Sequence, residues 1–186
     1  MKKVLLLGDS IRISYMPLVK EKLADIAEVT GPADNCRFSA YTLWNVNAWI
    51  REAGNPDVIH WNNGIWDVFH LAPETGIFTP LEYYLYNLKR ILVQLRKTGA
   101  VILWATTTPV WTPHPNLDNG EIDAYNRKAL QLMQQEGIGV NDLNARVKQD
   151  PAAFISADRL HLSEEGKEVC AIQVAERIRN LPLFKE

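Results

Sequence analysis

Short apolar runs alternate with longer amphipathic segments along the whole chain, and this alternation limits the possible folds more than any other feature. The first run, residues 4–7, is apolar at every position, which is typical of a strand covered on both faces. Further strands are predicted at residues 28–30, 58–61, 101–105 and 138–140, separated by helices at about 17–27, 39–53, 121–136 and 142–149. Repeated strand–helix alternation predicts an α/β fold with a parallel sheet.

One helix carries clear signals at both ends. Thr79 is expected as its N-cap, Pro80 as its first residue and Glu82 as the partner in a capping box. Gly99 supplies the stop. Between them a helical apolar stripe contains Leu81, Tyr84, Leu85, Leu88, Ile91, Leu92 and Leu95. The final helix is expected to begin at Ser163.

Size and composition indicate an ordinary globular protein. The chain has 186 residues, 47% of them hydrophobic, so we expect a single domain over residues 1–186. The formal net charge is -2 and charges of one sign do not cluster, which gives no support for a nucleic-acid or anionic-membrane partner. Two distant cysteines, Cys36 and Cys170, are expected as reduced thiols.

Nothing in the sequence indicates export or a membrane. The apolar run after Lys2 and Lys3 has four residues, fewer than the roughly 7–15 of a signal peptide. No window approaches the ~18 apolar residues of a membrane span. We therefore expect a cytoplasmic protein.

In parallel sheets ligands bind beyond the carboxyl ends of the strands. Five loops should therefore meet at one edge: residues 8–13, 32–39, 62–79, 106–120 and 156–162.

Two of these loops carry residues suited to nucleophilic catalysis. Gly8-Asp9-Ser10 follows the first strand, where nearby backbone N–H groups can stabilise a negative charge. Serine needs a base, usually a histidine oriented by a carboxylate, and Asp158 and His161 lie three residues apart on the last loop. Each motif alone also fits an ordinary turn or surface loop. Together they predict Ser10 as nucleophile, His161 as base and Asp158 as the orienting carboxylate.

Adjacent asparagines follow the third strand. A side-chain amide there can donate a hydrogen bond to an oxyanion, and the strand end favours Asn62, with Asn63 as the alternative. The same segment also fits a turn of Asn-Asn-Gly type.

With these motifs in this order, the sequence resembles the GDSL-type esterases, or SGNH hydrolases, in a branch similar to carbohydrate esterases. The resemblance covers nearly the whole chain and includes a Ser39-containing segment and the block from Asp158 to Leu162. It implies a flavodoxin-like, three-layer α/β/α sandwich with five parallel strands. It also implies ester hydrolysis without a metal or cofactor.

Three positions depart from the family pattern. Ile11 stands in place of the leucine of the name-giving motif, and Ala40 in place of a glycine. The third block has its glycine and asparagine exchanged. The resemblance implies an oxyanion hole made by the backbone N–H groups of Ser10 and Ala40 and the side chain of Asn62 or Asn63.

Substrate contacts are expected from side chains on the same loops. Asp9, Trp66, Trp111 and His114 are the candidates, and Trp61, Phe69, His70, Arg12 and Arg37 lie on or beside the same edge. Flat rings can stack on a sugar, cover an acyl chain or simply anchor the loops. The expected substrate is a small ester, with acetyl on a carbohydrate preferred.

Three other interpretations stay open. An acyltransferase would use the same residues with an alcohol in place of water. An inactive domain would bind the ligand without cleaving it. A phosphate or nucleotide binder would use residues 8–14 as an anion loop, although no P-loop motif occurs. The sequence leaves the oligomeric state open.

Overall fold

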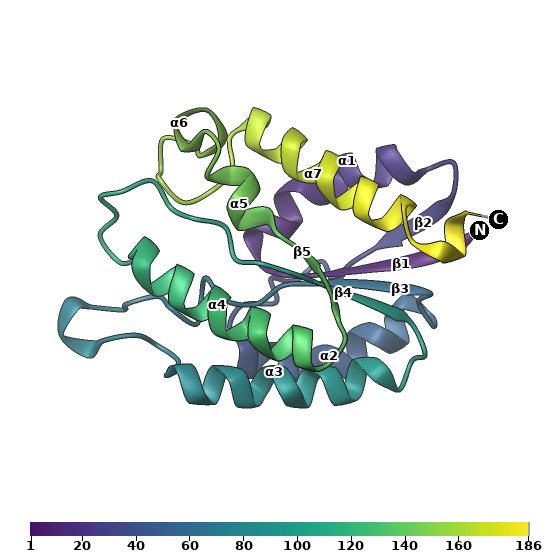
Figure 1. Ribbon diagram of the computed structural model, residues 1–186, viewed down its shortest axis with the longest axis horizontal. Coiled ribbons are helices and arrows are strands. Elements are labelled where there is room, and N and C mark those ends of the chain that lie inside the picture. Colours follow the sequence, from purple (N-terminus) through teal and green to yellow (C-terminus); the bar gives the residue numbers. More distant parts are fainter. Residues whose placement is uncertain (186) are drawn as a thin grey trace.

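A computed structural model describes residues 1–185, which form a parallel sheet between two layers of helices (Figure 1). The strand order is β2-β1-β3-β4-β5, the flavodoxin-like order. The strands are β1 (Lys2–Leu7), β2 (Ala27–Thr30), β3 (Val58–Trp61), β4 (Val101–Ala105) and β5 (Gly139–Asn141). The predicted three-layer α/β/α architecture is therefore confirmed.

Alternate strand residues fill two separate cores. One face of the sheet packs against α1 (Ser10–Leu23), α5 (Leu143–Val147), α6 (Pro151–Phe154) and α7 (Glu164–Arg179). The other packs against α2 (Ser39–Ala53), α3 (Leu81–Arg96) and α4 (Asn119–Gln135). In β1, Val4 and Leu6 face the first core and Leu5 and Leu7 the second. Both faces are covered, which explains the continuous apolar runs.

The first helix begins earlier than predicted. The sequence suggested a start at Pro17, but α1 begins at Ser10 and contains Pro17 in its interior. Its start is fixed by Asp9, whose carboxylate accepts the N–H of Ile11 at 2.9 Å. Ile11, Tyr15, Val19 and Leu23 recur every fourth residue and bury one face of the helix.

The predicted cap of α3 is also wrong. The helix begins at Leu81 with Pro80 at the N-cap position and no side-chain cap. Thr79 is instead buried, and its N–H donates to the carbonyl of Asp67 at 2.8 Å. By contrast, the start of the final helix is predicted to within one residue: α7 begins at Glu164, and Ser163 is its N-cap, accepting the N–H of Gly166 at 3.0 Å. Short helical turns at Pro73–Thr75, Pro151–Phe154 and Pro182–Phe184 were not predicted.

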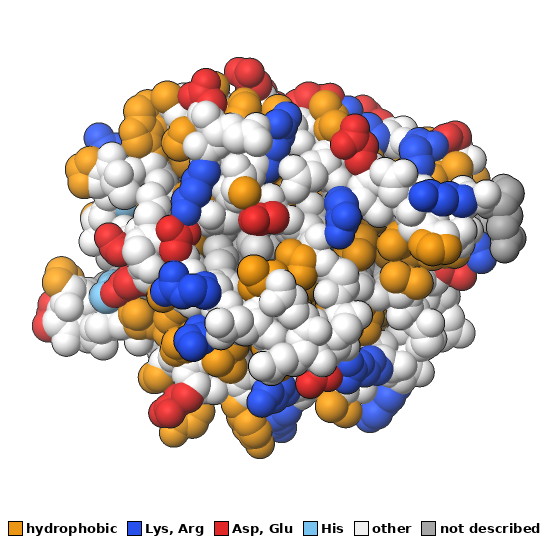
Figure 2. Space-filling view, in the orientation of Figure 1, with side chains coloured by type: hydrophobic (Ala, Val, Ile, Leu, Met, Phe, Trp, Pro, Cys, Tyr) orange, Lys and Arg blue, Asp and Glu red, His pale blue; other side chains and the backbone are white. Residues whose placement is uncertain are grey.

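Both termini lie at the amino ends of the strands, while the long 62–79 loop projects from the opposite end (Figure 1). Cys36 and Cys170 are buried free thiols, as predicted. Basic and acidic side chains intermingle on the face drawn in Figure 2. Within residues 1–185, no helix combines the length and apolarity needed to cross a bilayer.

Candidate active site

The three residues predicted to act together are joined through His161, which lies within hydrogen-bonding distance of both Ser10 and Asp158. Ser10 Oγ is 2.9 Å from His161 Nε2, and His161 Nδ1 is 2.7 Å from Asp158 Oδ2. This arrangement fits an imidazole whose Nδ1–H donates to Asp158 and whose Nε2 accepts the serine proton. The chain of contacts has the geometry by which a base activates a serine hydroxyl.

A tight turn before α7 aims Asp158 and His161. The N–H of Ser156 donates to the carbonyl of His161 at 2.8 Å, and Arg159 has a left-handed backbone with φ of 67°. Asp158 Oδ1 accepts the N–H groups of Leu160 and His161, each at 2.9 Å. The side chain of Asp158 therefore holds the turn closed with one oxygen and orients the imidazole with the other.

The same contacts keep Asp158 ionised. Partial burial alone would raise the pKa of this carboxyl, but the hydrogen bonds from Leu160, Ser156 and His161 outweigh burial and hold the pKa well below its ordinary value. An ionised carboxylate beside Nδ1 stabilises the imidazolium that forms when His161 takes a proton.

Ser10 is the first residue of α1, directly after the Asp9 cap. Its own N–H has no acceptor among residues 1–185, as is usual in the first turn of a helix. Asp9 is only 2% exposed, and burial raises the pKa of its carboxyl. Asp9 does not line the pocket beside Ser10, so its predicted contact with substrate is corrected to a capping role.

A buried arginine fixes the turn that carries Ser10. Arg12 donates to the carbonyls of Gly8 at 3.1 Å, Pro32 at 2.9 Å and Asp34 at 3.1 Å. These bonds join the β1–α1 turn to the loop after β2, and they give the buried guanidinium its hydrogen-bond acceptors. Arg12 is therefore neither a surface charge nor a substrate contact. Arg37, the other arginine considered, lies exposed over the ring of Tyr41.

The start of α2 is held by a second buried carboxylate. Asp67 accepts the N–H of Ser39 at 3.0 and 3.1 Å and its hydroxyl at 2.6 Å. Burial raises the pKa of Asp67 to about 6, although the hydrogen bonds from Ser39 act in the opposite direction. The N–H of Ala40, the next residue, has no acceptor within residues 1–185. Its role as an oxyanion donor stays a prediction.

The two asparagines after β3 point to different partners. Asn63 is buried; its amide donates to Arg37 O at 3.0 Å and Thr42 Oγ1 at 2.9 Å, and its carbonyl accepts the indole N–H of Trp61. Because both amide hydrogens are used, the alternative assignment of Asn63 to the oxyanion hole is corrected to a structural role.

Asn62 is only partly buried, and one of its two amide hydrogen bonds is long. Its amide donates to the carbonyl of Ala105 at 2.8 Å and lies 3.4 Å from Thr107 Oγ1. It borders a small cavity together with Asp9 and Arg12, and it does not line the pocket beside Ser10. Its assignment as oxyanion donor stays a prediction.

A pocket of about 410 Å³ opens beside Ser10 and His161. Its other walls are Phe38, Ile65, Trp66, Phe69, Leu71, Phe78, Leu117 and Leu160. The aromatic prediction identified Trp66 and Phe69. Trp61 is instead fully buried in the core, and neither Trp111 nor His114 lines the pocket.

The remaining wall residues were not predicted from the sequence, because isolated apolar residues in loops show neither helical nor strand periodicity. Trp111 nonetheless touches the turn that carries Asp158 and His161, since its N–H donates to the carbonyl of Arg159 at 2.9 Å. His114 lies close enough to Asp158 for their charges to interact, and partial burial lowers its pKa.

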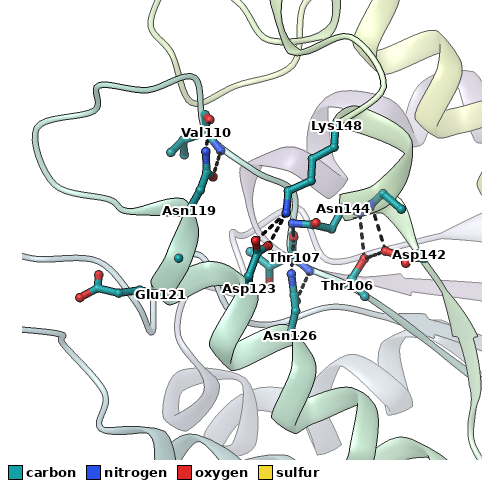
Figure 3. Close-up of polar contacts among 12 residues, drawn as sticks. Thr106, Thr107, Val110, Asn119, Glu121, Asp123, Asn126, Asp142, Asn144 and Lys148 are labelled. Atoms are coloured by element: carbon teal, nitrogen blue, oxygen red, sulfur yellow. Dashed lines mark hydrogen bonds and ion pairs between the residues drawn. The ribbon is translucent and has the colours of Figure 1, made fainter.

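Side-chain amides hold the pocket loops in place. Figure 3 shows Asn126 bound to both the N–H and the carbonyl of Thr107, and Asn119 bound in the same way to Val110, with all four distances between 2.8 and 2.9 Å. The 62–79 loop is joined to α4 by His70, whose Nε2 lies 2.8 Å from the Glu121 carboxylate. His70 thus has a structural contact.

Comparison with known proteins supports the same fold. No family model and no curated protein matches the chain. Solved structures do match over almost its full length. The acetyl xylan esterase AlAXEase is 21% identical with a TM-score of 0.81, covering 95% of this chain and 99% of that protein. The acetylxylan esterase Axe2 from Geobacillus stearothermophilus is 20% identical with a TM-score of 0.78, covering 95% and 94%.

A lipolytic protein of the G-D-S-L family from Desulfitobacterium hafniense DCB-2 is 16% identical with a TM-score of 0.75, covering 95% of this chain and 99% of its own. Identities this low establish the fold alone. The likeness to the SGNH hydrolases expected from the sequence is therefore confirmed for the fold, and function must be inferred from the site.

Proposed function

We propose that this chain is a serine esterase that cleaves carboxylic esters through an acyl-enzyme. The observation that carries the proposal is the continuous set of contacts from Ser10 through His161 to an ionised Asp158. Ser10, at the start of α1, and His161, on the turn before α7, both line a pocket large enough for a small molecule.

In the first step the Ser10 oxygen attacks the ester carbonyl while His161 Nε2 takes the serine proton. The tetrahedral intermediate expels the alcohol, which receives that proton from His161. Water then attacks the acyl-enzyme with His161 again as base, and the carboxylic acid leaves as Ser10 recovers its proton. The free N–H groups of Ser10 and Ala40, with Asn62, are the proposed donors to the oxyanion.

The small acyl group expected from the sequence fits the proposal. Two of the similar structures are acetyl xylan esterases, which makes acetyl esters the first substrates to test. Acyl transfer to an alcohol would pass through the same acyl-enzyme. Measuring acid and transferred ester together, with and without a sugar acceptor, separates the two reactions.

The test is hydrolysis of p-nitrophenyl acetate, butyrate and octanoate by the wild type, Ser10→Ala and His161→Ala. Each substitution should lower turnover by several orders of magnitude, and the double variant should be little worse than either alone, because the residues act as a unit. Ser14→Ala is the matched control, since its hydroxyl only bonds the carbonyl of Ile11 one turn earlier in the same helix. A loss of only a few fold in Ser10→Ala would refute the mechanism.

A further inference from the structure

The pocket beside the nucleophile is far more apolar than a sugar-binding site requires. Apart from Ser10 and His161, Trp66 is the only wall residue whose side chain carries a polar atom. No wall residue other than His161 is ionisable. Sites that recognise several hydroxyl groups place several hydrogen-bonding groups around the ligand, because each buried hydroxyl needs a partner.

The outer wall exposes apolar side chains to solvent. Trp66 is 41%, Leu71 66% and Phe78 41% exposed. The ring of Phe78 packs against Phe38, with 4.9 Å between centroids, so these two rings form one continuous part of the pocket wall. An apolar ligand group that covers this surface would remove it from water.

The volume sets the size of that group. At about 30 Å³ for each water-sized group, a pocket of about 410 Å³ has room for about a dozen non-hydrogen atoms. An acetyl group alone would leave most of this space unfilled.

We propose that the physiological ester carries an uncharged apolar group of about a dozen non-hydrogen atoms and that this group occupies the pocket formed by Phe38, Trp66, Leu71 and Phe78. This inference rests on the proposed esterase function and names its substrate class. The apolar group belongs either to the acid or to the alcohol of the ester, and the same pocket chemistry serves both.

Two isomeric esters separate these sources. Ethyl octanoate and octyl acetate each add six methylenes to ethyl acetate, on the acyl and the alcohol side respectively. Each buried methylene contributes about fourfold in binding, so the preferred isomer should exceed ethyl acetate by at least ~100-fold in kcat/KM. Acid release is measured below the solubility limit of each ester, with a per-acetylated methyl xyloside as the carbohydrate comparison.

A rim substitution links the preference to the pocket. Leu71→Asn should lower kcat/KM for the preferred isomer several fold more than it lowers kcat/KM for ethyl acetate, because only the longer group reaches the rim. Val93→Asn is the matched control, since Val93 is 53% exposed on α3 and does not line the pocket. It should change neither rate.

Binding without catalysis distinguishes failure of this inference from failure of the esterase proposal. Ser10→Ala should bind the unreactive ketone 2-decanone and unfold at a higher temperature in its presence, whereas acetone should have no such effect. Binding without Ser10-dependent hydrolysis of any ester would refute the esterase and support the apolar pocket. Ser10-dependent hydrolysis with equal rates for all esters, or with the xyloside fastest, would overturn the apolar substrate and support the esterase.

Discussion

The buried carboxylate of Asp67 makes a sharp prediction about stability. Burial raises its pKa from 3.8 to about 6, so the folded chain binds this proton more tightly than the unfolded chain. Between these two values the folded state carries more protons, and the free energy of unfolding must therefore fall as the pH rises.

The size of the effect follows from the shift. At 1.36 kcal/mol for each pKa unit, a shift from 3.8 to about 6 corresponds to about 3 kcal/mol. Below about pH 3.8 the carboxyl is protonated in both states and contributes nothing to the pH dependence. Above about pH 6 the free energy of unfolding has fallen by the full amount.

The experiment compares urea unfolding of the wild type and Asp67→Asn from about pH 3.5 to about pH 8. Asparagine cannot ionise, so the wild type should lose about 3 kcal/mol relative to the variant across the window. Any constant difference from the altered Ser39 contacts cancels in this comparison.

The variant Ser39→Ala provides a second test of the same prediction. Its hydroxyl bond lowers the pKa of Asp67, so removing that bond should move the decline to higher pH. Parallel wild-type and Asp67→Asn curves over the whole range would refute the reasoning.

Four further substitutions test the site and the helix that follows it. Asp158→Asn should fold normally and lower kcat by about 10³-fold or more, because the imidazole loses its orienting carboxylate; steady-state kinetics and a melting curve check both parts. Asn62→Ala should lower turnover by about 100-fold if Asn62 completes the oxyanion hole. Asn63→Ala should instead cost roughly 2 kcal/mol of stability, because its buried partners are left unpaired. An exchange of these two outcomes would reverse the assignment. Gly166→Ala should destabilise the chain by several kcal/mol in urea unfolding, because an added Cβ would lie 2.0 Å from the carbonyl oxygen of Phe154; a neutral result would show that α7 can shift.

The strands and the three catalytic candidates were predictable because their signals are local. Uninterrupted apolar runs mark β1 and β4, and Gly8 ends the first one. Asp158 and His161 lie on one turn, so their sequence spacing already places them together. Their distance to Ser10 then follows from the parallel topology, which brings successive loops to one edge.

Other features depend on tertiary contacts that sequence patterns do not contain. Pro17 looked like a first-turn residue, but the cap at Asp9 and the buried face decide where α1 begins. The local sequence does not distinguish which of the neighbouring Asn62 and Asn63 faces the site. Only the hydrogen bonds of Asn63 with Trp61 and Thr42 show that Asn63 lies in the core. Likewise, the apolar pocket is assembled from several separate segments.

Ser10 and His161 lie 151 residues apart in the chain yet share one hydrogen bond. During synthesis the proposed nucleophile is therefore made 151 residues before the proposed base. On refolding from denaturant, catalysis cannot return before the segment ahead of α7 has docked against the turn after β1. Recovery of ester cleavage would then time the docking of these two distant segments, which follows the return of the helical signal if the sheet forms first.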